Sequence, residues 1–523
     1  MNDAAVLPRL LVALRAAFLV ALAALVLLAL LRRRRGAPPS KTPVWLSAGI
    51  PLLFAAVWLH QGWWQLAGFA QPRFMAFLRR YDRRPTAGEV RPIRGRILDA
   101  RGEVLAFDDP DVPGLRRYPL GWAAAHPIGF LHPRYGRLGL EREADALLSG
   151  FAFSTPEERR RFGHNLIGLE RTRGGDLRLT LDARLQRAAA QALEGRRGAI
   201  VALRPADGAL LALVSAPSFD PEDPAAGLSA DPTEAPMVNR ALHGLYPPGS
   251  TFKIAVAGLA IESGFRGVLN CPGEGFVPLP GARPIRDHEY YAAARAGREW
   301  PGHGRLDLRE AFVRSSNVFF AQLGAAASAE RFVEMGRQLR IAESCVIFES
   351  ADGRMASRPG QGFAASDWNA GRRAQLAIGQ GSLLVTPLQM AVLAAAVAND
   401  GWVWHPRLSA DAPPTPWGRF FKPETARLLK TLMRETVQRG TGRRAEVPGG
   451  EVAGKTGTAQ NPRGDDHAWF AGFAPLDRPA LAFVVFVEHG GSGGLTAAPI
   501  AARLVRTALE CGWLDERAGE EPR

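Results

Sequence analysis

Lysine is scarce in this chain, although basic residues are plentiful. Of the 65 lysines and arginines in 523 residues, only five are lysines: Lys41, Lys253, Lys422, Lys430 and Lys455. A guanidinium does not release its proton in a protein, whereas an amine in an apolar site can lose it. Each lysine kept in so arginine-rich a sequence is therefore a candidate for chemistry that needs a neutral amine.

Cysteine is rare as well, with only Cys271, Cys345 and Cys511. This odd number at wide spacing excludes a disulfide framework and allows at most one bridge within the chain. The net charge of +14 could indicate a nucleic-acid partner. However, the densest basic run, Arg32–Arg35, lies between two apolar segments, where membrane topology explains it better. We predict no nucleic-acid partner.

Two long apolar segments lie near the N-terminus, Leu10–Leu31 and Val44–Ala70. Each can cross a hydrocarbon core, which needs about 20 residues, and the basic linker between them should stay in the cytoplasm. We predict a helical hairpin with spans near residues 10–31 and 44–66, which leaves the rest of the chain outside the cytoplasmic membrane. Alternatively, only the second segment spans, and the first lies in the interface or packs on a partner.

The patterns divide the chain into four regions: a membrane anchor at 1–72, a small β-rich accessory module at 73–175, one large mixed domain at 176–512 and a charged tail at 513–523. In the accessory module, apolar alternation on both sides of Asp99–Gly102 predicts a hairpin. The large domain opens with a helix that should begin near Asp182 and stop at Gly195.

Five strands are expected in the large domain. Residues 198–216 read as two strands joined by a Pro-Ala-Asp-Gly turn, and three more candidates follow one another closely near the C-terminus, in "EVAGKTGTA", "HAWFAGFAP" and "LAFVVFVEHG". Helical segments separate the two groups. This order predicts an α+β fold with an antiparallel sheet covered by helices.

One lysine follows a serine at the start of an apolar helical stretch. Pro247, Pro248 and Gly249 cannot extend a helix backwards, so Ser250 should lie in its first turn, with Lys253 one turn on. The lysine amine can then lie over the serine hydroxyl and remove its proton, if burial lowers the pKa of the amine. The alternative is an N-cap serine followed by a solvated lysine.

Two further short motifs favour the chemical interpretation. Ser315, Ser316 and Asn317 form a polar trio in an apolar helical context, where buried polar groups need partners. The strand candidate near the C-terminus carries Lys455, Thr456, Gly457 and Thr458, and its glycine leaves room for a ligand backbone to approach. Each motif alone is weak, but the three in this order are specific.

With these motifs, the sequence resembles the class B penicillin-binding proteins, membrane-anchored D,D-transpeptidases that cross-link peptidoglycan. The resemblance runs from about residue 91 to residue 501 and includes "RGRILDARGEVLA", "AIGQGSLLVTPLQMA" and "HAWFAGFAP". It implies the transpeptidase fold with a five-stranded antiparallel sheet. It also implies stem peptides as substrates, β-lactams as inhibitors, a polytopic membrane glycan polymerase as partner, and no cofactor. Two apolar segments instead of the usual single span depart from the family, as does the short accessory module.

The resemblance also implies roles for the motif residues. Ser250 would attack the penultimate D-alanine carbonyl, with Lys253 as its base, Ser315 as a proton relay, and Asn317 as a ligand of the substrate amide and of Lys253. Lys455, with the hydroxyls of Thr456 and Thr458, would bind the terminal carboxylate beside Gly457. Backbone N–H groups of Ser250 and Thr458 would form the oxyanion hole.

Other functions share this fold family. A D,D-carboxypeptidase or a β-lactamase would hydrolyse the acyl-enzyme with water, although no further glutamate loop for deacylation is recognisable. A β-lactam sensor would need a signalling domain, which is not visible. A scaffold that only activates a glycan polymerase would not need the complete set of motif residues.

A polar cluster between the first two motifs contains residue types that bind zinc: Cys271, Asp287, His288 and His303. Their spacing is irregular, which favours a hydrogen-bonded loop network, and we predict no metal. Asp466 and His467 precede a strand and are expected to cap a turn.

Overall fold

A computed structural model describes residues 93–514, apart from 113, most of 151–172, 364–367 and 462–463, together with a few helical residues between 49 and 60. The chain divides into two compact units, Met1–Asp82 and Arg83–Arg523. The predicted spans at 10–31 and 44–66 fall almost wholly outside the described residues. Among the residues that are described, no helix is both long and apolar enough to cross a membrane.

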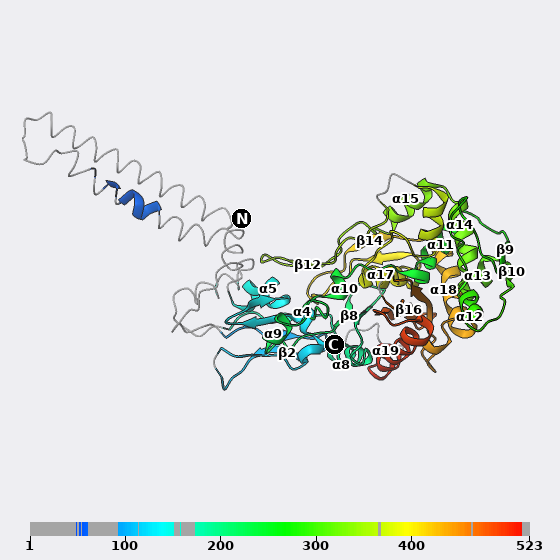
Figure 1. The fold of residues 1–523 in the computed structure, drawn as a ribbon. Coiled ribbons are helices and arrows are strands. Elements are labelled where there is room, and N and C mark those ends of the chain that lie inside the picture. Colours follow the sequence, from blue (N-terminus) through cyan, green and yellow to red (C-terminus); the bar gives the residue numbers. More distant parts are fainter. Residues whose placement is uncertain are drawn as a thin grey trace, which may run out of the picture. The chain divides into compact units, whose positions relative to one another are not determined.

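A five-stranded antiparallel sheet forms the centre of the second unit (Figure 1). Its order is β15 (Ala453–Ala459), β16 (His467–Ala474), β17 (Leu481–Val487), β7 (Gly198–Leu203) and β8 (Leu210–Ala216). The predicted five-stranded antiparallel sheet is thus confirmed. Its three central strands are buried along their whole length and are apolar apart from His467, because helices cover both faces.

Each face of the sheet packs against its own set of helices. On one face, α17 (Pro387–Ala398) is buried at every position and packs against β16, β17 and β7. On the other, α8 (Ala183–Ala192) and α19 (Ala498–Glu510) share a second hydrophobic core with the sheet. Asp182 caps α8 by accepting from two backbone N–H groups, so the predicted start of this helix is confirmed.

Further helices surround the motif residues. Their bounds are η3 Gly249–Phe252, α11 Lys253–Glu262, α12 His288–Arg295, α13 Leu308–Arg314, α14 Asn317–Ala326, α15 Ala329–Gln338, α16 Ala370–Ala377 and α18 Pro423–Arg439. Shorter helices are η2 Gly121–Ala123, α4 Ala125–Ile128, α5 Leu140–Glu143, α6 Asp145–Leu148, α9 Pro224–Leu228, α10 Arg240–His243, η4 Arg443–Ala445 and η5 Gly493–Ala497.

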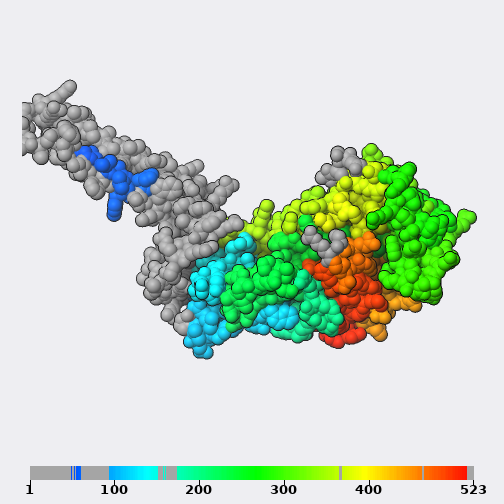
Figure 2. All heavy atoms as spheres, in the orientation of Figure 1, coloured from blue at the N-terminus to red at the C-terminus, as the bar shows by residue number. Residues whose placement is uncertain are grey.

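Small sheets occupy the periphery. They are formed by β3 (Arg116–Arg117), β2 (Val104–Asp108), β1 (Ile97–Leu98) and β6 (Leu177–Arg178), by β4 (Phe130–His132) with β5 (Gly136–Leu138), by β9 (Leu269–Pro272) with β10 (Gly302–Leu306), by β11 (Val346–Glu349) with β12 (Arg354–Ala356), and by β13 (Trp402–Trp404) with β14 (Pro416–Arg419). The antiparallel pairing of β1 with β2 confirms the predicted hairpin. In Figure 2, the green surface of residues near 250–340 forms one end of the second unit, and the blue and cyan surface of residues 93–150 lies toward the other.

The N-terminal part of this unit is held together by buried charges. Glu141 is fully buried, and its two carboxylate oxygens accept hydrogen bonds from Arg94 and Arg116, each at 2.7 Å. Burial raises the pKa of Glu141, but the two guanidiniums more than offset this and hold the pKa below its ordinary value. Removal of this one carboxylate would take a buried counter-charge from both Arg94 and Arg116.

Candidate active site

Ser250 lies in the first turn of this helical segment, as the sequence predicted, and that turn is 3₁₀-helical. The turn η3 precedes α11, which begins at Lys253. Gly249 has a positive φ of 54°, and its N–H donates to the carbonyl of Gly379 at 2.9 Å. A Cβ on Gly249 would lie 2.7 Å from the carbonyl oxygen of Thr458. The turn that carries the half-buried Ser250 therefore lies directly against β15.

The side chain of Lys253 is fully buried and points to the second motif. Its Nζ donates to the Ser315 carbonyl at 2.7 Å, to Asn317 Oδ1 at 2.8 Å and, at 3.4 Å, to Ser315 Oγ. In the described part of the chain, no hydrogen bond joins this amine to the Ser250 hydroxyl, so the expected contact between them is not made. Its two short hydrogen bonds go instead to the Ser315 carbonyl and the Asn317 side chain.

The second motif lies at a break between two helices, α13 and α14. Ser315 ends α13 in the left-handed conformation, with φ 62° and ψ 36°. Ser316 then caps α14 by accepting the N–H of Phe319 at 3.2 Å. This break turns the Ser315 carbonyl and the Asn317 side chain toward Lys253. A non-glycine residue in this region is strained and is often found at functional sites.

The third motif lies on β15 as predicted, at the edge of the sheet. Lys455 is fully buried, and its Nζ donates to Ser315 Oγ at 2.7 Å. The hydroxyl of Ser315 thus contacts both amines. The structure brings the side chains of Lys253, Ser315, Asn317 and Lys455 into one cluster, although the two lysines are 202 positions apart in the sequence.

Burial lowers the pKa of both amines. The pKa of Lys253 falls to about 7 because the amine is desolvated, against the opposing charges of Asp287 and Glu289. The pKa of Lys455 falls well below its ordinary value because of burial and the neighbouring charge of Lys253. Phenyl rings complete the apolar surroundings, with Phe320 near Lys253 and Phe312 near Lys455. One of these amines can therefore be neutral near pH 7.

Asp287 supports the second motif, a contact that the sequence did not reveal. Its carboxylate accepts the backbone N–H groups of Asn317 and Val318, the second at 3.1 Å, and the Ser316 hydroxyl at 3.2 Å. Asp287 therefore satisfies the first N–H groups of α14. No local sequence signal marks this contact, because 30 residues separate Asp287 from Asn317.

Thr441 is a second residue that sequence reasoning missed. Its exposed side chain places Oγ1 2.6 Å from Oγ1 of the buried Thr456. On the same strand, Thr458 Oγ1 accepts the N–H of Gly493 at 3.3 Å. The loop after α18 and the first turn of η5 thus border the strand that carries Lys455.

The four residues weighed as a metal cluster do not converge in the described residues, where no group of three or more potential ligands could hold an ion. Cys271 donates weakly to a backbone carbonyl, and Asp287 is occupied by α14. His303 lies 3.8 Å from Asp287 and 3.6 Å from Glu289. His467 begins β16, and its Nδ1 accepts the N–H of His489 at 3.1 Å, which is a turn contact.

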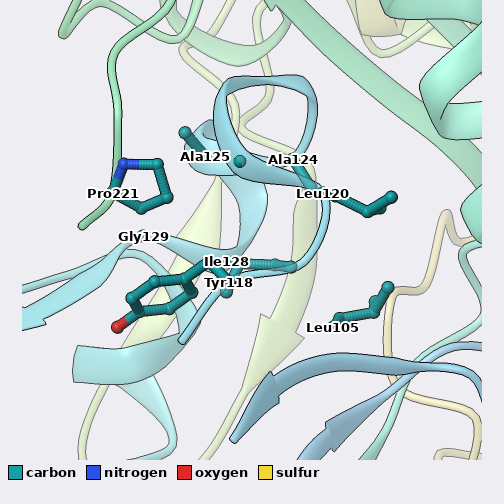
Figure 3. A pocket seen from close by; sticks show the side chains of 9 residues that line it. Leu105, Tyr118, Leu120, Ala124, Ala125, Ile128, Gly129 and Pro221 are labelled. Carbon is teal, nitrogen blue, oxygen red and sulfur yellow. The ribbon is translucent and has the colours of Figure 1, made fainter. Parts of the chain in front are cut away.

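A small apolar recess lies apart from the motifs (Figure 3). It is lined by Leu105, Tyr118, Leu120, Gly121, Ala124, Ala125, Ile128, Gly129 and Pro221. None of these side chains can act as acid, base or nucleophile near neutral pH, and burial raises the pKa of Tyr118 further. This recess therefore offers no group for acid–base or nucleophilic chemistry.

Comparison with known proteins shows the family of this chain. The model of the penicillin binding protein transpeptidase domain matches residues 198–506. The peptidoglycan D,D-transpeptidase PbpA of Mycolicibacterium smegmatis is 33% identical over 465 residues, which cover 80% of this chain and 89% of that protein. The peptidoglycan D,D-transpeptidase MrdA of Escherichia coli K12 is 30% identical, over 80% of this chain and 70% of its own length.

Solved structures give the same result. The penicillin G acyl-enzyme of penicillin-binding protein A from Mycobacterium tuberculosis superposes with a TM-score of 0.69 at 30% identity, over 80% of this chain and all of the other. The ceftriaxone acyl-enzyme of that protein gives a TM-score of 0.70 at 29% identity, over 80% of this chain and 99% of the other.

Proposed function

The chain belongs to the penicillin-binding transpeptidase family, and we infer that it is a peptidoglycan D,D-transpeptidase that works through a serine acyl-enzyme and is acylated by β-lactams. One observation supports this most directly: two fully buried amines, Lys253 and Lys455, contact the same hydroxyl, that of Ser315, beside the turn that carries Ser250. An amine kept neutral by burial can accept a proton from a hydroxyl at physiological pH.

Acylation would form one bond and break one. Ser250 Oγ bonds to the carbonyl carbon of the penultimate D-alanine, and its proton passes to neutral Lys253. The peptide C–N bond then breaks, and the proton moves from Lys253 through Ser315 Oγ to the leaving nitrogen. Because Lys253 Nζ has no hydrogen bond to Ser250 in the described residues, we propose that substrate binding brings the two together. Catalytic hydrogen bonds are often long before substrate binds.

The edge strand would hold the substrate. Its backbone can pair with an extended stem peptide, while Lys455 and the hydroxyls of Thr456 and Thr458 bind the terminal carboxylate by charge-assisted hydrogen bonds. A side chain at Gly457 would lie 2.9 Å from the Pro248 carbonyl, so glycine allows β15 and the serine turn to approach closely. Backbone N–H groups of Ser250 and Thr458 would then face the developing oxyanion.

The side chain of Asn317 has room for a second role. Its Oδ1 accepts from Lys253, and its Nδ2 donates to the Arg286 carbonyl at 3.0 Å. An amide nitrogen carries two hydrogens, and the second of these can contact the substrate amide. Asn317 would thus bind the substrate and hold the base.

Labelling with a fluorescent penicillin tests this function. We expect a long-lived adduct on the wild type and none on Ser250→Ala. Fast loss of the adduct would instead indicate a D,D-carboxypeptidase or a β-lactamase, and no adduct on the wild type would indicate a scaffold. Transfer of a labelled D-amino acid into a glycan that carries D-Ala-D-Ala stems then separates cross-linking from hydrolysis.

We also propose that the chain is anchored in the bacterial cytoplasmic membrane with its catalytic domain outside, and that it works with a polytopic glycan polymerase. Two apolar segments around the basic run Arg32–Arg35 support the anchor. Protease accessibility in intact spheroplasts tests the orientation. Cross-linking in membranes, followed by identification of the captured protein, tests the partner.

A further inference from the structure

Four residues before Ser250, a tyrosine is held by a carboxylate that directly follows β17, the central strand of the sheet. The hydroxyl of Tyr246 donates to Glu488 Oε1, and the same oxygen accepts from Arg240 Nε at 3.0 Å. The side chains of Glu488 and Arg240 are only 11% and 5% exposed, so this is a buried charged hydrogen bond. No step of the mechanism above uses these residues.

Several contacts fix the ring of Tyr246. It packs on Phe486 of β17, with ring centroids 4.1 Å apart, and contacts the edges of His467 and Trp469. Its backbone exchanges two hydrogen bonds with Val385, at 3.0 and 2.9 Å. A Cβ on Gly244 would lie 2.3 Å from the ring, so glycine at that position makes room for it. Only Pro247, Pro248 and Gly249 then separate Tyr246 from the nucleophile.

Glu488 also lies close in sequence to the loop that contacts the edge strand β15. It follows the last residue of β17, and its N–H donates to the Arg197 carbonyl at 2.8 Å. Five residues later, Gly493 donates to the hydroxyl of Thr458 on β15. One carboxylate therefore stands between the turn that carries Ser250 and the loop that supports the Thr458 end of the edge strand.

We propose that Glu488 and Tyr246 are positioning residues: the carboxylate, acting through the tyrosine hydroxyl, sets the place of the Ser250 turn relative to β15. The proposal rests on the proposed acyl transfer, because it concerns the distance between the nucleophile and the N–H groups that would bind the oxyanion. Arg240 orients the carboxylate through its hydrogen bond. Neither residue touches the substrate.

The first test measures acylation by a fluorescent penicillin in Tyr246→Phe and Glu488→Gln. Phenylalanine keeps the ring packing and removes only the hydroxyl. Because small misplacements of reacting groups are costly, we expect the acylation rate constant to fall about tenfold to a hundredfold. At the end of the reaction, all of the protein should still be labelled. A purely structural role would instead reduce the labelled fraction and leave the rate of the folded molecules unchanged, which would overturn the proposal.

Tyr118→Phe is the matched control. Tyr118 is a buried tyrosine whose hydroxyl, like that of the half-buried Tyr246, makes a hydrogen bond: it accepts the N–H of Leu131 at 2.7 Å, in the N-terminal part of the unit. We expect this variant to lower the unfolding temperature without slowing acylation. The double variant of Tyr246 and Glu488 should acylate no more slowly than the slower single variant, since both act through one hydrogen bond. If the rate losses of the two single variants multiplied in the double variant, Tyr246 and Glu488 would not act through one hydrogen bond.

Hydrogen exchange gives a readout that does not depend on activity. We expect faster exchange in the peptide that spans residues 246–253 in Tyr246→Phe and Glu488→Gln, and unchanged exchange there in Tyr118→Phe. Unchanged exchange in the first two variants would overturn the positioning role even if the wild type proved not to be acylated. Failure of wild-type acylation with faster exchange in the variants would overturn only the transpeptidase function.

Discussion

The amines of Lys253 and Lys455 bind the same oxygen atom, Ser315 Oγ, at 3.4 and 2.7 Å. Both amines are fully buried, so a proton on either one is disfavoured by desolvation and by the charge of the other. The hydroxyl between them offers a path by which a proton can move from one to the other. Asp287 and Glu289 favour a proton on Lys253, while a substrate carboxylate would favour one on Lys455.

The acylation rate should depend on pH through Lys253. Its pKa is lowered to about 7, and only the neutral amine can accept the hydroxyl proton. We therefore expect the rate constant for penicillin acylation to rise with pH, to reach half its maximum near pH 7 and to level off above. Stopped-flow labelling between about pH 5 and pH 10 measures this rate constant. The range includes the lowered pKa and extends toward the ordinary pKa of lysine. A midpoint near 10 would refute Lys253 as the base, and so would full activity in Lys253→Arg.

Asp287→Asn should move this pH profile. The carboxylate raises the pKa of Lys253, so its neutralisation should lower the midpoint below that of the wild type. The loss of a charged cap on α14 should also destabilise the fold by about 1–2 kcal/mol. Asp307→Asn is the matched control, because Asp307 caps α13 by accepting the N–H of Glu310 at 2.9 Å. It should lose stability and keep the wild-type profile.

Thr441→Val should weaken non-covalent binding of penicillin before acylation. Thr441 hydrogen-bonds Thr456, so its loss leaves that hydroxyl without a fixed orientation toward the carboxylate. The cost of one such hydrogen bond, about 1 kcal/mol, corresponds to roughly a fivefold higher dissociation constant. Thr441→Ser should restore affinity. Thr431→Val, which removes an exposed hydroxyl on α18 that donates to the Arg427 carbonyl, should bind as the wild type does.

Gly379→Ala should disrupt the serine turn. The residue has φ 72°, and a Cβ there would lie 2.0 Å from the Gly249 carbonyl oxygen. We expect a loss of at least about 1 kcal/mol of stability and slow acylation. Gly381→Ala has nearly the same φ, 74°, but its Cβ would meet only Gln375, at 3.3 Å. If both variants slowed acylation equally, backbone conformation rather than the approach to Gly249 would be the cause.

Glu141→Gln separates stability from catalysis. It leaves Arg94 and Arg116 buried with less opposing charge, which should destabilise the fold by about 3 kcal/mol or more. The pKa of Glu141 is lower in the folded state than in the unfolded state. The charged carboxylate therefore stabilises the fold above the unfolded-state pKa. This stabilisation is lost as the pH falls through the folded-state pKa. Denaturant unfolding at several pH values measures the loss. Acylation by the folded fraction should stay at the wild-type rate.

Local sequence was sufficient for the sheet and for the identity of the motif residues. Apolar runs such as Leu481–Val487 can be recognised as strands in the sequence, because a strand covered on both faces must be apolar throughout. Five lysines among 65 basic residues drew attention to Lys253 and Lys455, because only an amine can be neutral in a buried site.

Tertiary structure alone decided which groups meet. Lys253 bonds the Ser315 carbonyl and Asn317, more than 60 residues away, because the break between α13 and α14 at Ser315 turns these groups toward it. The contacts of Asp287 with Asn317 and of Glu488 with Tyr246 join residues from separate parts of the chain. Periodicity and spacing describe neighbours along one element, whereas side chains from different elements meet only when burial of their apolar faces has fixed how those elements pack.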